Sequence, residues 1–396
     1  MPNIFNIGGD GKNAAFKKDI LKYFVANGNS TINELAKDTS LSVPTVSKAV
    51  GELLDLGYVE EYGKQETGEG RRPNLYGLNP ESGYFVGVEI KNGFVNMGLM
   101  NFRGDLVELD DNVPCRIDNT MESVDELCGL VSRFIDKSDV DRSRIVNTTF
   151  CISGRVNSES GYSHTLYNFS EQPLTKILSE RVGCEVDIEN DTRAFAYGEY
   201  MKGAVDGEKN VLFVNVSWGL GLGIIIGGEL YKGKSGFAGE FGHTHMFDND
   251  ILCHCGKKGC LETEASGSAL QRMVRERIEN GESSFLIKRT GDIFSLENII
   301  DATNNEDPLC IDVVEHVGSH LGESVANLIN IFNPELVVIG GMLARTGDFL
   351  LQSVTASVRK YSLSIVNKDT RLCLSKLRER GGVIGACLLA RKSVLD

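Results

Sequence analysis

The sequence contains no long hydrophobic run and no surplus of positive charge, and each absence excludes a class of protein. Its longest apolar runs, Val211–Val216 and Gly219–Gly228, are far shorter than the about 20 residues of a membrane-spanning helix. The first residues contain no apolar segment of a secretory signal, so we expect a cytoplasmic protein. The net charge of −14 disfavours contact with nucleic acid over the chain as a whole.

A disulfide framework is also absent. Of the ten cysteines only three cluster, and the others are scattered through apolar surroundings, which is typical of reduced thiols in a cytosol. The chain of 396 residues is 41% hydrophobic and 24% charged, the composition of a folded protein. Its length predicts two or three domains.

The first eighty residues contain the pattern of a winged helix-turn-helix. An apolar stripe predicts a helix over Lys17–Asn27, a capping box beginning at Thr31 predicts a second helix, and Ser42 caps a third. Two strands, Tyr58–Tyr62 and Asn74–Leu78, then form a hairpin. Within this part, residues 12–50 have a net charge of +3, so a phosphate backbone is tolerated here.

The outer face of the third helix and the hairpin tip carry small hydroxyl and basic side chains, which suit a DNA groove. The candidates for DNA contact are Ser42, Pro44, Thr45, Ser47, Lys48, Arg71 and Arg72. The alternative is a three-helix module that binds protein, and the acidic residues around the hairpin favour that alternative.

The stretch Ser235–Gly267 holds the pattern H-x9-C-x-C-x4-C. His243, Cys253, Cys255 and Cys260 offer one imidazole and three thiolates, which fill the tetrahedron of a structural zinc ion. The alternative is three buried cysteines that are neighbours by chance. The histidine ligand is less certain than the cysteines because His245 and His254 compete for the fourth position.

Carboxylates crowd the same stretch. Glu240 and Glu262 flank the predicted zinc ligands, so the metal would hold them rigidly, and bidentate acceptors match vicinal hydroxyls of a sugar. The alternative is ordinary solvated surface charge. Upstream, Asn190 and Asp191 lie where a strand meets a helix. Asp191 suits either a base that accepts a hydroxyl proton or the N-cap of that helix.

Two stretches share one cadence of strand, glycine turn and strand. They begin at Tyr84 and at Val211, and each is followed by helices and further strands. This pattern predicts a duplicated α/β unit with a cleft between two lobes.

The segments FAGEFGH, CHCGKKGC, IENDT and NPELVVIGG together resemble the ROK family, which groups sugar-responsive repressors with sugar kinases. The resemblance extends from about Tyr84 to Leu389. It implies an actin-like ATPase fold of two ribonuclease-H-like lobes behind the winged helix-turn-helix. The expected domains are residues 1–80 for DNA binding, 81–200 completed by 381–396 for the first lobe, and 201–380 for the second lobe with the zinc site.

The resemblance also implies a sugar pocket. By family match its residues are Gly154, Arg155, Asn190, Asp191, Glu240, His243 and Glu262. The kinases of the family carry an Asp-x-Gly-Gly-Thr phosphate loop after the first strand, where this sequence has Glu89–Gly93. Because phosphoryl transfer depends on positioning and charge neutralisation, this departure predicts that ATP is not used.

The sequence therefore predicts a repressor that binds operator DNA as a homodimer or homotetramer. Its effector would be a monosaccharide or sugar phosphate, its zinc structural, and its effector response a population shift between two arrangements of the winged domains. Two other functions stay open: an ATP-dependent sugar kinase with an accessory DNA-binding domain, and a sugar sensor whose winged domain docks a protein.

Overall fold

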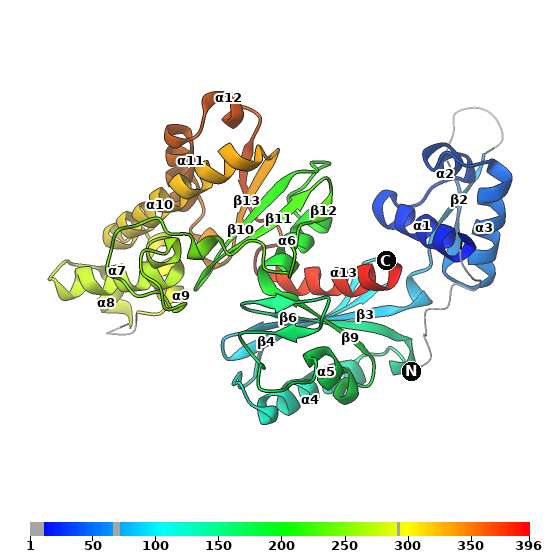
Figure 1. Ribbon diagram of the computed structural model, residues 1–396, viewed down its shortest axis with the longest axis horizontal. Coiled ribbons are helices and arrows are strands. Elements are labelled where there is room, and N and C mark those ends of the chain that lie inside the picture. Colours follow the sequence, from blue (N-terminus) through cyan, green and yellow to red (C-terminus); the bar gives the residue numbers. More distant parts are fainter. Residues whose placement is uncertain (1–11, 66–71, 291–293) are drawn as a thin grey trace. The chain divides into compact units, whose positions relative to one another are not determined.

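The computed structural model describes residues 12–65, 72–290 and 294–396 (Figure 1). Internal contacts divide the chain into two compact units. The first unit contains Met1–Gly154, Ser160–Glu189 and Ala386–Asp396, and the second contains Arg155–Glu159 and Asn190–Gly385. Each unit is described by itself below.

The N-terminal part of the first unit is a winged helix-turn-helix. Its elements are α1 (Lys12–Asn27), α2 (Ile32–Asp38), α3 (Val43–Asp55), β1 (Val59–Lys64) and β2 (Asn74–Leu78). The predicted capping box is confirmed, because Thr31 accepts the Glu34 N–H while the Glu34 carboxylate accepts the Thr31 N–H at 2.8 Å. Ser42 caps α3 as predicted. The first helix begins five residues earlier than expected, and β1 extends beyond Tyr62 to Lys64.

The remainder of the first unit is built on one five-stranded sheet in the order β5-β4-β3-β6-β9. The strands are β3 (Tyr84–Lys91), β4 (Phe94–Asn101), β5 (Leu106–Pro114), β6 (Ile145–Ile152) and β9 (Glu185–Asn190). Helices α4 (Met121–Lys137) and α5 (Leu174–Val182) lie beneath the sheet in Figure 1, and α13 (Gly381–Leu395) lies above it. Short strands β7 (Val156–Asn157) and β8 (Tyr162–Ser163) follow β6.

The second unit repeats this sheet. Its order is β12-β11-β10-β13-β14, from β10 (Val211–Val216), β11 (Leu220–Ile226), β12 (Glu229–Leu230), β13 (Leu336–Gly340) and β14 (Arg371–Leu374). β3 and β10 are the first strands of their sheets along the chain. Each pairs antiparallel with the next strand and parallel with a later one. The shared order confirms the duplication that the sequence predicted.

Helices complete the second unit. They are α6 (Asp191–Lys202), α7 (Gly267–Glu279), α8 (Phe285–Thr290), α9 (Leu296–Asn304), α10 (Pro308–Phe332), α11 (Asp348–Tyr361) and α12 (Ser364–Asn367). The 25-residue α10 buries its apolar stripe in a core that it shares with β10, β11 and β13. Short 3-10 turns lie at Pro80–Ser82, Arg142–Arg144, Phe241–His243, Leu261–Thr263, Met342–Thr346 and Arg378–Arg380.

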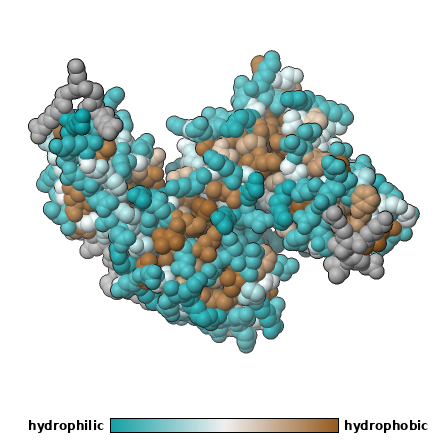
Figure 2. All heavy atoms as spheres, turned by 180° about the vertical axis from the view of Figure 1, so that it is seen from behind, coloured by the Kyte–Doolittle hydropathy of each residue, from teal (hydrophilic) through white to brown (hydrophobic). Residues whose placement is uncertain are grey.

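The face shown in Figure 2 is mostly hydrophilic, with hydrophobic areas between the polar ones. The most exposed large apolar side chains of the described residues are Ile365, Ile331 and Leu252. In the described part of the chain, no helix combines the length and apolarity that crossing a membrane requires.

Candidate metal centre and sugar-binding site

The four predicted metal ligands come together in the second unit. The ligand atoms of His243, Cys253, Cys255 and Cys260 all lie within 4.8 Å of one another. The Sγ atoms of Cys255 and Cys260 are 3.7 Å apart, and Cys253 Sγ is 3.6 Å from His243 Nδ1. A tetrahedral ion with Zn–S bonds of about 2.3 Å separates its sulfur ligands by about 3.8 Å. The donor set and its spacing therefore fit zinc.

Two glycines let the chain fold back on itself at this centre. Gly256 and Gly259 have φ of +84° and +74°, which other residues rarely adopt. A Cβ on Gly259 would also lie 2.2 Å from the Phe247 carbonyl oxygen. The turn is closed by hydrogen bonds from Gly256 N–H to Cys253 O and from Cys253 N–H to Lys257 O. The glycine spacing is thus a requirement of the backbone path.

The competing histidines have other partners. His254 Nδ1 lies 2.8 Å from Glu262 Oε1, and with Cys253 these two residues form a second group of close ligand atoms. His245 belongs to neither group found among the described residues, and its ring lies against Gly259. Geometry therefore favours His243 as the fourth ligand.

The thiols differ in acidity without a metal. Burial raises the pKa of Cys253 and of Cys260. Burial also acts on Cys255, but hydrogen bonds from the Lys257 backbone and the other thiols lower its pKa on balance. A metal ion that binds here must displace protons from the two buried thiols, so its affinity rises with pH.

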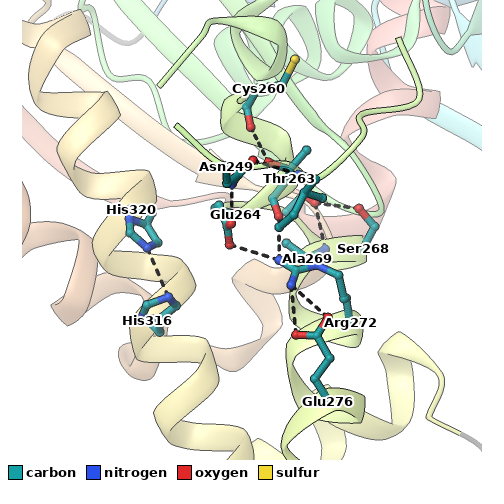
Figure 3. A network of polar contacts seen from close by, with 12 residues as sticks. Asn249, Cys260, Thr263, Glu264, Ser268, Ala269, Arg272, Glu276, His316 and His320 are labelled. Carbon is teal, nitrogen blue, oxygen red and sulfur yellow. Dashed lines mark hydrogen bonds and ion pairs between the residues drawn. The ribbon is translucent and has the colours of Figure 1, made fainter. Parts of the chain in front are cut away.

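Figure 3 shows the network that fixes the turn after the third cysteine. Thr263 Oγ1 donates to Cys260 O at 2.8 Å, and the Arg272 guanidinium donates to Thr263 O at 3.0 Å and to Glu264 at 3.1 Å. Asn249 also donates to Glu264 at 2.7 Å. Arg272 projects from α7, so this helix holds the turn that carries Glu262.

Glu262 is a buried carboxylate that lies against the backbone of two glycines. Its Oε2 accepts the Leu220 N–H at 2.8 Å. A Cβ on Gly219 would come within 2.7 Å of the same oxygen, and a Cβ on Gly242 within 3.3 Å. Larger residues at either position would push Glu262 away. Gly219, just before β11, and Gly242, in the 3-10 turn Phe241–His243, therefore leave room for the carboxylate.

His243 connects the metal ligands to a second carboxylate. Its Nδ1 faces the Cys253 thiol, and its Nε2 lies 3.8 Å from Glu240 Oε2. An imidazole that ligates a metal through one nitrogen keeps the other available for a hydrogen bond. The imidazole of His243 thus lies between the metal ligands and Glu240.

Asn190 and Asp191 lie at the junction of β9 and α6, as predicted. The cap of α6 is Asn190, whose Oδ1 accepts the Arg193 N–H at 3.1 Å, so the N-cap interpretation of Asp191 was wrong. Asp191 Oδ1 accepts the Thr192 N–H at 2.7 Å. The exposed Arg155 is in the same unit, whereas Gly154, with φ of +92°, belongs to the first unit.

Charged side chains lie at the end of β3, where the sequence departs from the phosphate loop of the family's kinases. Glu89 is 2% exposed, and its carboxylate contacts Lys91 Nζ at 2.5 Å and accepts from Asn96 Nδ2 at 3.0 Å. Both of its oxygens therefore have partners on the β3–β4 hairpin.

The candidate DNA-contact face of α3 is exposed. Val46, Val50 and Leu53 are buried on its inner side. The exposed predicted residues are Ser42, Pro44, Thr45, Ser47, Lys48 and, on the wing, Arg72. Arg71 lies outside the described residues. Glu52 of α3 forms a 2.7 Å ion pair with the buried Lys17 of α1, which holds the two helices together.

Sequence reasoning missed three residues of these sites. His254 entered only as a competing metal ligand, although its Nδ1 lies 2.8 Å from the Glu262 carboxylate. Arg193 is 3% exposed and donates to the carbonyls of Val156 and Gly236, which joins β7 to a loop distant in sequence. Lys91 is the cation on Glu89. The neighbouring sequence does not indicate which distant residues His254 and Arg193 contact. Lys91, in contrast, lies only two positions after Glu89, so an ion pair between them could have been predicted.

Comparisons with known proteins agree with this architecture. The ROK family model matches residues 94–393, and a winged helix-turn-helix DNA-binding model matches residues 15–60. The xylose repressor of Caldicellulosiruptor bescii is 30% identical over 381 residues, 95% of each chain. The crystal structure of a ROK family transcriptional regulator, described as a homologue of the Escherichia coli MLC protein, aligns with a TM-score of 0.83 at 28% identity. It covers 98% of this chain and 97% of that one.

A sugar kinase is also similar. The ROK family glucokinase of Streptomyces griseus, solved with glucose and AMPPNP, aligns with a TM-score of 0.70 at 28% identity. The match covers 78% of this chain and all of that one. The chain therefore belongs to the ROK family, with the actin-like ATPase-type fold of that family preceded by a winged helix-turn-helix.

Proposed function

We propose that this protein is a DNA-binding transcriptional repressor whose affinity for its operator is set by a monosaccharide or sugar phosphate. In this proposal residues 1–80 bind DNA, the carboxylates of the second unit bind the sugar, zinc is structural, and the protein does not phosphorylate its ligand. It acts as a homodimer or homotetramer, because paired half-sites require paired winged domains.

The proposal is supported mainly by one observation: the same chain contains a winged helix-turn-helix and a ROK family domain. The similarity to a named repressor spans 95% of both chains, including the DNA-binding part. The match to the glucokinase, in contrast, covers 78% of this chain. The repressor relatives therefore account for a part of the protein that the kinase leaves unexplained.

The absence of kinase activity is supported by the environment of Glu89. A kinase carboxylate here needs free oxygens to help hold Mg²⁺ and a glycine-rich backbone to wrap phosphate. The oxygens of Glu89 contact Lys91 and Asn96, so an internal ammonium stands where a metal cation would be needed. Lys91 and Asn92 also replace the glycines of the family loop.

Sugar binding is supported by the chemistry of the second unit. Glu240, His243 and Glu262 are held by the turn that also carries the thiols, and acceptors fixed in this way select the hydroxyls of a sugar. The effector must bind one arrangement of the protein more tightly than the other, since equal affinity shifts nothing.

The test is to select DNA from a random-sequence duplex pool and to measure its binding by fluorescence anisotropy across salt concentrations. We expect specific binding with a steep salt dependence, because phosphate contacts release counterions. A neutral or phosphorylated monosaccharide should change that affinity. The single tryptophan, Trp218, is exposed and directly precedes Gly219, which lies beside Glu262. We therefore expect its fluorescence emission to change when a sugar binds.

A parallel assay measures ADP released from ATP and Mg²⁺ with the same sugars. The proposal expects no turnover. Turnover at the ~1–100 s⁻¹ of ordinary kinases would overturn the interpretation of Glu89–Gly93. Failure of the pool selection to enrich any sequence would instead favour a winged domain that docks a protein.

A further inference from the structure

Two histidines that belong to neither site described above lie one turn apart on the long helix α10. His316 and His320 have the i, i+4 spacing that places two side chains on one face of a helix. His316 is exposed and His320 is partly buried. Their Nε2 atoms face each other at a distance of 3.2 Å (Figure 3). The surface of α10 thus presents two imidazole nitrogens at one point.

The distance between the two nitrogens is that of two ligands of one metal ion. Metal–nitrogen bonds of about 2.0–2.1 Å place two ligand nitrogens about 2.9 Å apart at a right angle and about 3.4 Å apart at the tetrahedral angle. The separation of 3.2 Å lies between these values. Without a metal, one Nε2 donates its N–H and the other accepts it. A metal ion would bind both lone pairs once that proton has moved to Nδ1 of the donating ring.

Neighbouring groups position the pair and favour a cation beside it. The His320 ring packs edge-to-face against Phe247, with the ring centroids 4.8 Å apart and the planes at 80°. The two imidazole rings are also edge-to-face, with their centroids 4.6 Å apart. These contacts restrict the rotation of the His320 ring. The carboxylates of Glu264 and Glu323 interact electrostatically with His320, and their negative charge attracts a cation.

The remaining ligands of such an ion would be water molecules. The oxygens of Glu264 accept hydrogen bonds from Asn249 at 2.7 Å and from Arg272 at 3.1 Å. Among the described residues, the groups of three or more close ligand atoms include neither His316 nor His320. Imidazole nitrogen suits zinc, copper and nickel, whereas magnesium and calcium need several oxygen ligands. With two protein ligands, the ion would be held less tightly than in a tetrahedron of thiolates and imidazole.

We propose that His316 and His320 form a second metal site, which binds one divalent transition-metal ion of the class that prefers imidazole: Cu²⁺, Ni²⁺ or Zn²⁺. The ion would join two successive turns of α10, the helix that shares its core with β10, β11 and β13. Because these turns exist only in the folded protein, the bound ion would stabilise the second unit. The proposal does not depend on DNA binding, on sugar binding or on the thiolate centre.

The test uses the full-length protein, saturated with zinc and then dialysed. Nickel chloride is titrated into it by isothermal titration calorimetry, and zinc is measured by elemental analysis before and after. We expect about one Ni²⁺ per chain to bind without release of zinc, and Cu²⁺ to bind more tightly than Ni²⁺. His316→Gln and His320→Gln should each weaken Ni²⁺ binding at least about tenfold, because even an outer partner of a metal ligand is worth about 10–100-fold in affinity.

Two other histidines supply matched controls. His164→Gln changes an exposed histidine of the first unit, and His254→Gln changes the histidine that lies close to Cys253 and Glu262. Both variants should bind Ni²⁺ as the wild type does. Thermal unfolding is an independent readout, because an ion that binds the folded state raises its melting temperature. Ni²⁺ should raise it in the wild type and in both controls but not in His316→Gln. Without metal, His316→Gln should melt close to the wild type, since the replaced side chain is exposed.

Three outcomes would overturn the proposal. One is that neither Ni²⁺ nor Cu²⁺ binds, and another is that His316→Gln binds Ni²⁺ as well as the wild type does. In either case the histidine pair would be an N–H···N hydrogen bond and nothing more. The third is that zinc is released as Ni²⁺ binds, or that His254→Gln abolishes the binding, which would place the ion at the thiolates or beside Glu262. None of these outcomes would affect the proposed regulation of DNA binding by a sugar.

Discussion

The two five-stranded sheets have the same strand order but different chemistry after their first strand. In the first unit, β3 ends in a buried ion pair between Glu89 and Lys91, supported by Asn96. In the second unit, the turn after β10 leads into glycines that leave room for Glu262. In the first unit the side chains of Lys91 and Asn96 thus occupy both oxygens of the carboxylate, whereas in the second unit glycines leave room around Glu262. The same strand order therefore supports two different local environments.

The largest effect is expected from replacing one metal ligand of the second unit. Cys255→Ser should abolish zinc binding, because structural zinc is held by a complete tetrahedron and contributes directly to folding. Zinc per chain by elemental analysis should fall from about one to near zero, and the sugar response should disappear. Cys373→Ser, at a thiol outside the cluster, is the control that should keep its zinc. An unchanged zinc content in Cys255→Ser would refute the assignment.

A smaller effect is expected from removing a buried carboxylate of α6 in the second unit. Glu199 is 0% exposed, and it accepts hydrogen bonds from Ser375 Oγ at 2.5 Å, Leu377 N–H at 2.7 Å and Ala204 N–H at 3.0 Å. Glu199→Ala leaves these donors buried and unpaired, which should cost about 3–5 kcal/mol in urea unfolding. A loss below about 1 kcal/mol would show that water replaces the carboxylate.

The matching change in the first unit is Lys91→Met. The variant keeps the apolar stem but removes the ammonium that contacts the buried Glu89 carboxylate, which keeps its hydrogen bond from Asn96. Because the Lys91 side chain is 34% exposed, solvent reduces the effect, and we expect a loss of about 1–3 kcal/mol. ADP release should remain absent. A gain of ATP turnover in this variant would mean that Lys91 alone suppresses kinase activity.

The smallest effect concerns pH. Burial and the neighbouring His316 lower the pKa of His320 on α10, while Glu264 and Glu323 oppose this shift. The unfolded state therefore binds a proton more readily than the folded state, so stability falls as pH decreases below about 6.5. His320→Gln should flatten the dependence of the urea midpoint on pH between about pH 7 and pH 5. An unchanged slope would show that His320 does not contribute to the pH dependence.

The sequence predicted the parts that depend on local patterns. The capping box at Thr31, the strand Asn74–Leu78 and the cysteine spacing at Cys253–Cys260 are encoded in neighbouring residues, and each is confirmed as a structure. The duplication followed from glycine turns and apolar strands. The roles of the proposed site residues remain predictions.

Long-range partners could not be predicted in the same way. The pair of Lys17 with Glu52 and the contact of His254 with Glu262 depend on how elements pack, which hydrophobic periodicity does not specify. The N-cap interpretation of Asp191, which the sequence left open beside that of a base, was wrong for a related reason. Asn190 and Asp191 both suit an N-cap, and only the backbone decides between them.

The central claim is that sugar bound near Glu262 changes DNA affinity. Its most direct test is the anisotropy of the selected DNA with wild-type protein and with Glu262→Gln, each titrated with the monosaccharide that quenches or enhances Trp218 emission. We predict that the sugar changes the DNA affinity of the wild type about tenfold or more and leaves that of Glu262→Gln unchanged. An equal response of both proteins, or no response of either, would contradict the account.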